Sequence, residues 1–305
     1  MGLAHIEGYQ PVILVTGCSS GIGKALAELL WAMPQYRVVV TARASSLSAL
    51  ESKFSDNARF LIRALDVTDD EQIVDVVGEI YKKWRAVDIV INNAGISYRS
   101  VLEHMDEHSE LHQLKTNYLG PMSLTRMVLP TMREKGFGRI INISSVSGLV
   151  AMPTMGSYSA SKAALESASE SLWYEMKPFG VKVSIVQPGF VHSESYRNVY
   201  YSKKAQLSES LLGPYSLYYR SITPFIEKLM KLSRTTPEEI AEKILGVIES
   251  ENPPLWVPIS LDAFVFNMMR RLMPHWLYYN VMFWLMPRSD EWSQKYPAFT
   301  AHEES

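Results

Sequence analysis

Tyr158 and Lys162 stand four positions apart in the stretch Ser157-Tyr158-Ser159-Ala160-Ser161-Lys162. On a helix this step places both side chains on one face, one turn apart. Free tyrosine has a pKa of about 10 and exchanges protons poorly at neutral pH, but a nearby cation favours the phenolate and lowers that pKa. A phenol beside an ammonium can therefore act as an acid/base group. Taken alone, the pair is also what an exposed helix could carry by chance, so the rest of the chain must decide.

A glycine-rich turn near the N-terminus indicates a cofactor site. Residues 11–16 form a short apolar, β-branched run typical of a buried strand, and residues 24–30 have helical character. Glycine between a strand and a helix permits a tight turn and a close approach of the backbone to a pyrophosphate. An ordinary strand-to-helix turn is the alternative, but the position after the first strand favours cofactor binding. The predicted cofactor-binding residues here are Gly17, Ser19, Ser20, Gly21, Ile22 and Gly23.

The end of the second predicted strand bears on the choice of cofactor. Residues 37–41 form this strand, and Ala42 and Arg43 close it. In dinucleotide-binding folds an acid at this point binds the ribose 2′-hydroxyl of NAD and repels a 2′-phosphate. Ala42 stands where that acid would be, and the guanidinium of Arg43 suits a phosphate by its charge and its paired donors. We therefore expect NADP(H) to be preferred over NAD(H). The alternative is that Arg43 is a solvated surface residue.

Asp66 and Val67 follow a third predicted strand at residues 59–65. Two roles are open for Asp66. Its carboxylate accepts a hydrogen bond from the adenine amino group, or it caps the helix that starts at residues 68–70. Both Asp66 and Val67 are included in the predicted cofactor site. Helical periodicity then runs from residue 69 to residue 84.

Amide side chains follow the fourth predicted strand, residues 87–91. This strand ends in Asn92-Asn93-Ala94-Gly95. Such amides either join neighbouring strands or line the cofactor, and the structural role is favoured for the amide pair. Asn117 lies in a long helical segment at about residues 109–133. A buried Asn in a helix is costly unless it is paired, so Asn117 either bonds the local backbone or joins a polar relay.

The remaining strands are predicted at residues 138–143, 181–186 and 255–258. Strands alternate with helices throughout, which predicts one α/β domain over residues 1–305. Its fold class is a Rossmann-type doubly wound parallel sheet of about seven strands with helices on both faces. In such sheets ligands lie beyond the carboxyl ends of the strands. The residues predicted to fall there are Gly17, Asn92, Ser145 and Pro188.

Taken together, these motifs resemble those of the short-chain dehydrogenases/reductases of the classical type. The matching residues are Thr16-Gly17-x-x-x-Gly21-Ile22-Gly23, Asn92-Asn93-Ala94-Gly95, Asn117, Ser145, Tyr158-x-x-x-Lys162 and Pro188-Gly189. Their order and spacing are far more specific than any one of them. The resemblance covers about residues 11–193 strongly and the seventh strand more weakly. It implies an enzyme that interconverts an alcohol and a carbonyl compound by hydride transfer.

The resemblance also implies the roles of the catalytic residues. Tyr158 is the general acid/base, and Lys162 lowers its pKa and holds the nicotinamide ribose. Ser145 polarises the substrate carbonyl, and Asn117 supports a proton relay through Lys162. Hydride delivery leaves a developing oxyanion, which needs a hydrogen-bond donor and a proton but no metal. The further cofactor contacts that we predict are Asn93, Ala94, Gly95, Pro188, Gly189, Val191 and Ser193, the last through its hydroxyl to the carboxamide.

Composition excludes several other classes of protein. The formal charge of −2 gives no overall basic field, so nucleic acid is not an expected partner. The single cysteine, Cys18, allows no internal disulfide and no Cys-rich metal site. Residues 1–10 have no secretory pattern, and no run reaches the roughly 18 apolar residues of a membrane span. We expect a cytoplasmic location, with membrane association left open by the C-terminal segment.

Two segments concern the substrate. Residues 193–236 break the alternation of strands and helices, are rich in Tyr and Ser, and are predicted to form a substrate lid; a surface excursion is the alternative. An apolar extension at about residues 260–288 is most aromatic over residues 261–286. It closes the pocket or a subunit interface, rests on a membrane surface, or is ordinary core. It loosely resembles the tails of membrane-associated retinol and steroid dehydrogenases of this family.

The expected function is therefore NADP(H)-dependent oxidation and reduction of a lipophilic substrate such as a steroid, a retinoid or a long-chain lipid, by a protein that forms homo-oligomers. Two alternatives stay open. The first is a reductase of small carbonyl compounds, in which the aromatic tail serves packing. The second is a non-catalytic dinucleotide-binding sensor, against which the complete Ser145, Tyr158 and Lys162 set argues because a sensor needs no proton donor.

Overall fold

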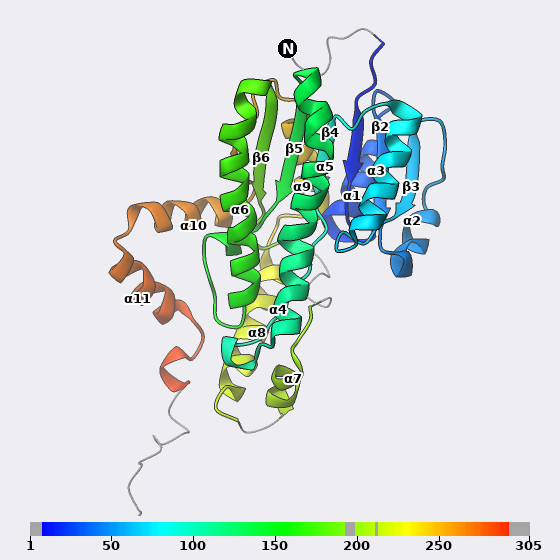
Figure 1. The fold of residues 1–305 in the computed structure, drawn as a ribbon. Helices are drawn as coiled ribbons and strands as arrows, with labels where there is room; N and C mark the ends of the chain where they lie inside the picture. The colour runs from blue at the N-terminus through cyan, green and yellow to red at the C-terminus, as the bar shows by residue number, and fades with distance from the viewer. Residues whose placement is uncertain (1–7, 193–198, 211–212, 293–305) are drawn as a thin grey trace, which may run out of the picture.

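The computed structural model describes residues 8–192, 199–210 and 213–292. Its centre is one sheet of seven parallel strands in the order β3-β2-β1-β4-β5-β6-β7 (Figure 1). The strands are β1 (Val12–Val15), β2 (Arg37–Ala42), β3 (Phe60–Ala64), β4 (Ile89–Asn92), β5 (Gly138–Ile143), β6 (Val181–Gln187) and β7 (Trp256–Pro258). The predicted strands all exist, and the predicted fold class is confirmed.

The strands are apolar because the sheet is covered on both sides. Every residue of β1 and β4 is buried, so these segments read as continuous Val and Ile runs rather than as alternating patterns. The strand order reverses direction between β1 and β4, which pair with Ile13 opposite Ile89. In doubly wound sheets a crevice opens at this point, beyond the carboxyl ends of the strands.

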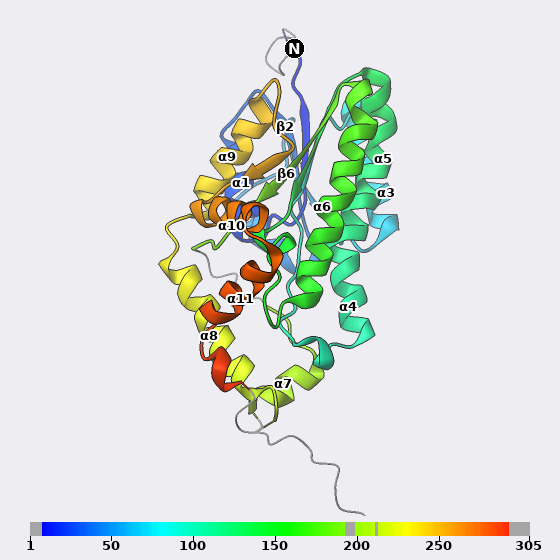
Figure 2. The same cartoon turned by 90° about the vertical axis from the view of Figure 1, so that its left-hand side faces the viewer.

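Two layers of helices enclose the sheet (Figures 1 and 2). On one face lie α1 (Gly21–Trp31) and α9 (Pro237–Glu249), whose apolar residues share a buried cluster. On the other lie α3 (Asp70–Trp84), α5 (Gly120–Lys135) and α6 (Gly156–Met176). The short α2 (Ser48–Glu51) follows β2, and α4 (Glu107–Leu114) continues into α5 through a π-helical turn, Lys115–Leu119. Single 3-10 turns occur at Ala44–Ser46, Leu102–His104, Val146–Gly148, Lys177–Phe179 and Ser289–Glu291.

Local capping fixes where two of these helices begin. Asp69 caps α3, since its carboxylate accepts hydrogen bonds from the backbone N–H groups of Glu71 and Gln72. Thr236 caps α9 in a reciprocal capping box with Glu239, and Pro237 occupies the first helical position. The N-cap of α3 is therefore Asp69 and not Asp66.

A third layer of helices lies beyond the carboxyl ends of the strands (Figure 1). It comprises α7 (Lys203–Ser210), α8 (Ser216–Leu232), α10 (Leu261–Leu272) and α11 (His275–Leu285). The described parts of the predicted lid are thus mainly α7 and α8. Buried residues of α8, α10 and α11, among them Ile222, Ala263 and Tyr278, share a separate apolar cluster. The C-terminal extension is therefore partly packed against the predicted lid.

Candidate active site

The glycine turn between β1 and α1 leaves no room for a side chain at two of its glycines. Gly17 has φ +70°, and a Cβ on it would come within 2.7 Å of the Ala94 Cα. A Cβ on Gly23 would lie 2.3 Å from the Gly17 carbonyl oxygen. Asn93 holds the turn from the side, because its Nδ2 donates to the carbonyl oxygens of Thr16 and Gly17 at 2.9 and 3.0 Å. Backbone of this kind at a helix N-terminus fits a pyrophosphate.

A cavity of about 880 Å³ extends from this turn to Tyr158. Most of the predicted site residues line it. These are Gly17, Ser19, Ser20, Gly21, Ile22, Arg43, Asp66, Val67, Asn93, Ala94, Gly95, Ser145, Tyr158, Lys162, Pro188, Gly189 and Val191. Two predicted residues do not. Gly23 lies beneath the turn, where it lets α1 pack closely on Gly17, and Asn117 is buried behind the cavity wall. Ser193 lies outside the described residues.

The end of β2 forms one end of this cavity. Ala42, Arg43, Ser45 and Ser46 line it, so no carboxylate follows β2 at this point. Asp66 lines the same end. Its Oδ1 accepts hydrogen bonds from the backbone N–H and the hydroxyl of Thr68 at 2.9 and 2.8 Å. Since Asp69 caps α3, Asp66 fixes the preceding turn, and a contact of Asp66 with adenine stays a prediction.

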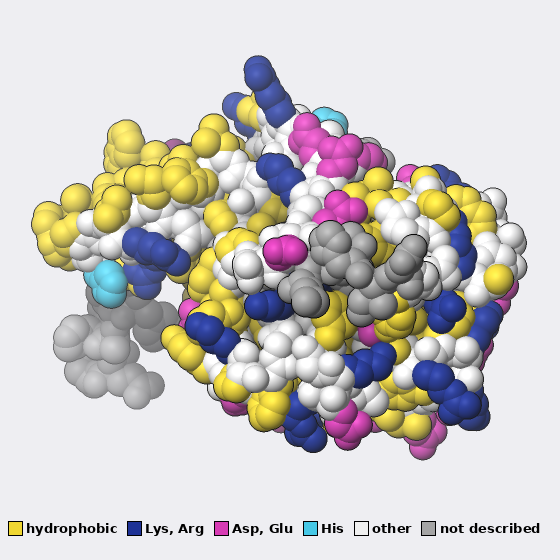
Figure 3. Space-filling model, turned by 90° about the horizontal axis from the view of Figure 1, so that it is seen from above, with side chains coloured by type: hydrophobic (Ala, Val, Ile, Leu, Met, Phe, Trp, Pro, Cys, Tyr) yellow, Lys and Arg dark blue, Asp and Glu magenta, His cyan; other side chains and the backbone are white. Residues whose placement is uncertain are grey.

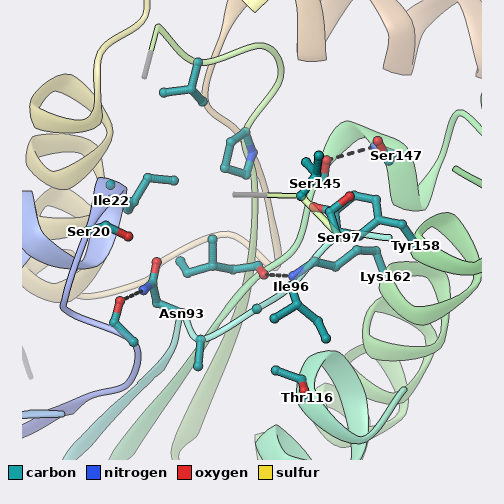
Figure 4. Close-up of a pocket in the computed structure, with 18 of the residues that line it drawn as sticks. Ser20, Ile22, Asn93, Ile96, Ser97, Thr116, Ser145, Ser147, Tyr158 and Lys162 are labelled. Atoms are coloured by element: carbon teal, nitrogen blue, oxygen red, sulfur yellow. Dashed lines mark hydrogen bonds between the residues drawn. The ribbon is translucent and has the colours of Figure 1, made fainter. Parts of the chain in front are cut away.

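Ser145, Tyr158 and Lys162 meet at the other end (Figure 4). Ser145 follows β5 and caps a 3-10 turn, where its Oγ accepts a hydrogen bond from the Ser147 N–H at 3.1 Å. Tyr158 and Lys162 lie one turn apart in the first half of α6, as the spacing predicts. The Lys162 Nζ donates to the Ile143 carbonyl oxygen at 2.8 Å and lies 5.9 Å from the centre of the Tyr158 ring.

Burial dominates the ionisation of the pair. It raises the pKa of Tyr158, while a hydrogen bond with Ser145 and the charge of Arg99 act in the opposite direction. Burial likewise lowers the pKa of Lys162 to about 8. The net lowering of the tyrosine pKa that the sequence suggested is therefore not found in this structure, because desolvation outweighs the nearby cations. The phenol of Tyr158 is a candidate proton donor.

The amides keep the structural roles favoured from the sequence. Asn92 donates to the Asn142 side chain at 2.8 Å and so joins β4 to β5. Asn117 lies in the π-helical turn and is fully buried. Its Oδ1 accepts from the Ile96 N–H, and its Nδ2 donates to the Ile96 carbonyl oxygen and to the Ser161 hydroxyl, each at 2.9 Å. Asn117 therefore bonds the backbone of Ile96, 21 positions away in the sequence, and links α6 to the cavity wall.

A buried acid that was not predicted from the sequence lies behind Tyr158 and Lys162. Glu166 continues the face of α6 that carries Tyr158 and Lys162, one further turn along. Its Oε1 accepts hydrogen bonds from the Ser144 hydroxyl at 2.7 Å and from the Gln187 amide at 2.8 Å. Burial raises its pKa, and the charge of Lys162 lowers it. The signal was available, since the three residues recur every four positions.

The wall beyond Tyr158 is mostly apolar. The side chains that form it come from the 3-10 turn after β5, the following loop, the segment after β6, α8 and α10. They are Val146, Val150, Met152, Met155, Phe190, Ile226, Met230 and Phe266. Two polar residues, Ser97 and Arg99, also line this part, and nothing in their local sequence distinguished them. No group of three or more metal-ligating side chains occurs within the described part of the chain.

The start of the C-terminal extension supports this end of the cavity. The Ser260 hydroxyl accepts a hydrogen bond from the Gly189 N–H at 3.0 Å, and Asp262 accepts one from the Phe190 N–H at 2.6 Å. Asn267 of α10 donates to the Gln187 side chain at 3.0 Å. These contacts hold the loop after β6 against the cavity.

Comparisons with known proteins agree with this geometry. The profile of the short chain dehydrogenase family matches residues 11–204. A 3-ketodihydrosphingosine reductase of Bacteroides thetaiotaomicron is 34% identical over 80% of this chain and 86% of its own length. A short-chain dehydrogenase of Streptomyces avermitilis has a structure with TM-score 0.73 and 32% identity, covering 94% of this chain and 98% of its own. One from Burkholderia cenocepacia, in complex with NADP, has TM-score 0.68 and 25% identity over 91% and 98%. The chain belongs to the short-chain dehydrogenase family of oxidoreductases.

Proposed function

We propose that this protein is an NADP(H)-dependent oxidoreductase that interconverts a primary or secondary alcohol and its aldehyde or ketone on a lipophilic substrate. The observation that carries the proposal is one continuous cavity. Its glycine turn and Arg43 lie at one end, and Ser145, Tyr158 and Lys162 lie at the other beside an apolar wall. A dinucleotide laid along the cavity fits the turn, and a substrate fits the remaining space.

The side chains support each part of a carbonyl reduction. The nicotinamide, when bound, supplies or accepts the hydride. The hydroxyls of Ser145 and Tyr158 line the same cavity and can both donate to a substrate oxygen placed between them. The Tyr158 hydroxyl can release its proton to the developing oxyanion. The charge of Lys162 then stabilises the phenolate that remains.

The residues after β2 favour NADP(H). Ala42 brings no carboxylate to repel a 2′-phosphate, and Arg43 lines the cavity there together with Ser45, Ser46 and Ser48. A guanidinium and several hydroxyls suit a phosphate. The NADP complex of the Burkholderia cenocepacia relative is in keeping with this proposal.

The C-terminal extension supports a lipophilic substrate delivered from a membrane surface. Phe266 of α10 lines the cavity, whereas Trp276 and Trp284 of α11 are 69% and 79% exposed. Apolar side chains gather over this arm of the molecule (Figure 3). So much exposed surface is not ordinary core, and an aromatic face of this kind suits a lipid interface. No helix in the described ranges is long and apolar enough to cross a membrane, so we propose a peripheral contact.

That contact is tested with the pair of substitutions Trp276→Gln and Trp284→Gln. Both side chains are largely exposed, so the variant should fold like the parent. Co-sedimentation with phosphatidylcholine vesicles should fall about tenfold, because two aromatic anchors are lost. If the parent does not co-sediment with vesicles but dimerises through this face, the exposed aromatic surface is a subunit contact and not a membrane contact.

The proposed activity is tested by cofactor absorbance with paired carbonyl substrates. Long-chain aldehydes, steroid ketones and retinal should each be reduced with NADPH more efficiently than acetone or propanal. Turnover confined to the small carbonyls would favour the alternative reductase, in which the arm serves packing. Cofactor binding with no turnover of any carbonyl or alcohol would favour the sensor.

A further inference from the structure

Arg99 is a buried cation with unused hydrogen-bond donors in the part of the cavity beyond Tyr158. We call this part the substrate half and the part beside the glycine turn the cofactor half. Only 4% of its surface is exposed, and it lines the cavity with Met230 and Tyr158. Its Nε and Nη1 have no hydrogen-bond partner among the described residues, and its Nη2 reaches the Met230 Sδ at 4.0 Å. A buried guanidinium left in this state is costly, because it has lost water without gaining acceptors. A ligand that supplies the missing acceptors would offset this cost.

Ser97 adds a second unused donor to the same wall. Its Oγ is buried and has no hydrogen-bond partner within the described part of the chain, and the residue lines the cavity beside Tyr158 (Figure 4). Ser97 and Arg99 flank Tyr98, which forms a parallel β-bridge with Tyr200, and both residues line the same cavity. One wall of the cavity therefore presents a hydroxyl and a guanidinium together.

The backbone holds this wall in place from both sides. The Arg99 N–H donates to the Tyr200 carbonyl oxygen, and the Tyr200 N–H donates to the Ser97 carbonyl oxygen, each at 2.8 Å. The Tyr98 N–H donates to the Gln113 side chain at 2.8 Å, and the Val101 N–H donates to the Tyr219 hydroxyl at 3.1 Å. Four hydrogen bonds fix the main chain of this segment, so the Arg99 side chain starts from a fixed backbone position.

We propose that Ser97 and Arg99 bind an anionic oxyacid group, a carboxylate or a phosphate, on the substrate close to its reacting carbonyl. The inference rests on the proposed function, because it gives that lipophilic substrate a charged head. A planar guanidinium offers paired donors to two oxygens of such a group, and the serine hydroxyl offers a further one. The apolar wall would then take the alkyl part of the same molecule.

Glu227 supplies the competing explanation. It lies on α8, and its negative charge acts on Arg99, although the described residues contain no ion pair of Arg99 within 4 Å. If Arg99 existed to pair with Glu227, removing either residue would weaken the fold. If Arg99 serves a ligand, Glu227 only competes with that ligand for the guanidinium.

The test is calorimetric binding of three amphiphiles that differ in the head: octanoate, octyl phosphate and octanol. Binding is measured with the full chain saturated with NADP⁺ and again without nucleotide. The parent should bind at least one anion about 10- to 100-fold more tightly than octanol, the range expected for a charge-assisted contact. The anion that binds more tightly identifies the head as carboxylate or phosphate. Equal affinity for all three would overturn the proposal.

Variants locate the preference within the cavity. Arg99→Met should reduce the affinity for the anion to that for octanol, whereas Arg126→Met, which removes an exposed guanidinium of α5 outside the cavity, should leave the affinity for octanoate unchanged. Glu227→Gln should tighten octanoate binding and leave thermal unfolding unchanged. Weaker binding or a less stable fold in Glu227→Gln, or a retained preference in Arg99→Met, would show that Arg99 has a structural role.

Binding and turnover separate the two proposals. A preference for the anion without turnover of any carbonyl compound leaves the anion site standing and overturns the proposed function. The opposite outcome has two parts: the parent turns over 4-oxodecanoate and its methyl ester with equal KM, and it binds anions and octanol equally in calorimetry. That outcome overturns the anion site alone. The proposal expects a KM for the acid about tenfold below that for the ester, lost in Arg99→Met.

Discussion

The two halves of the cavity are built in different ways. In the cofactor half the lining residues directly follow β1, β2, β3 and β4, so the parallel sheet brings together segments that each carry a short local motif. In the substrate half the walls come from the 97–99 segment, the turns after β5 and β6, α8 and α10. The sheet dictates the first half, whereas loops and appended helices determine the second. The chemistry is thus fixed by the fold, and specificity is open to change.

The largest effect is expected where the two halves meet. Tyr158→Phe removes only the hydroxyl that we propose as the proton donor, so turnover should fall about 10²- to 10⁴-fold while cofactor affinity stays nearly unchanged. Steady-state kinetics and cofactor titration measure both. Tyr200→Phe is the matched control, because Tyr200 also lines the cavity but has no part in the proposed chemistry. Turnover of Tyr158→Phe within about tenfold of the parent would remove this residue from the mechanism.

The same division explains what could be predicted from the sequence. The strands, the glycine turn and the Tyr158–Lys162 pair could be predicted because each depends on residues that are close together in the sequence. Arg99 could not be found in this way, since its burial depends on Tyr200 and α8, which are distant in sequence. The direction of the Tyr158 pKa was also missed, because desolvation is a property of the assembled cavity.

A second prediction changes the cofactor half alone. Ala42→Asp combined with Arg43→Ala adds an acid for a ribose hydroxyl and removes the cation proposed to hold a phosphate. The contact is worth roughly 1.5–3 kcal/mol, so the preference for NADPH over NADH should fall by about one to two orders of magnitude. Comparison of kcat/KM for the two cofactors measures this. A parent protein that already favours NADH would contradict the proposed phosphate contact at the end of β2.

Rigidity of the cofactor half is tested by Gly23→Ala. The new Cβ would meet the Gly17 carbonyl oxygen at 2.3 Å, so the free energy of unfolding should fall by about 1–3 kcal/mol and cofactor binding should weaken. Gly246→Ala is the matched control: this helical glycine has nothing within 4 Å of its Cβ position, and the change should stabilise α9 by about 0.4–1 kcal/mol. If the two substitutions changed the free energy of unfolding equally in chemical denaturation, the close packing of the turn would be contradicted.

The smallest effect concerns the pH dependence of stability. Burial lowers the pKa of Lys162 to about 8 in the fold, below its unfolded value of about 10.4. Between these values the unfolded state binds more protons, so the free energy of unfolding of the parent relative to Lys162→Met should rise with pH, by at most about 1.4 kcal/mol per pH unit. Below pH 8 the difference should be flat. A flat difference up to pH 10 would mean that Lys162 titrates at its ordinary value.

The most direct test of the account follows the hydride itself. The protein is incubated with a long-chain ketone, such as 2-dodecanone, and with NADPH that carries two deuterium atoms on C4 of its nicotinamide. The account predicts that the alcohol product, analysed by mass spectrometry, carries one deuterium on the carbinol carbon, and that Tyr158→Phe forms almost none of it. An alcohol without deuterium, or no alcohol despite bound NADPH, would contradict the assignment of this cavity to hydride transfer.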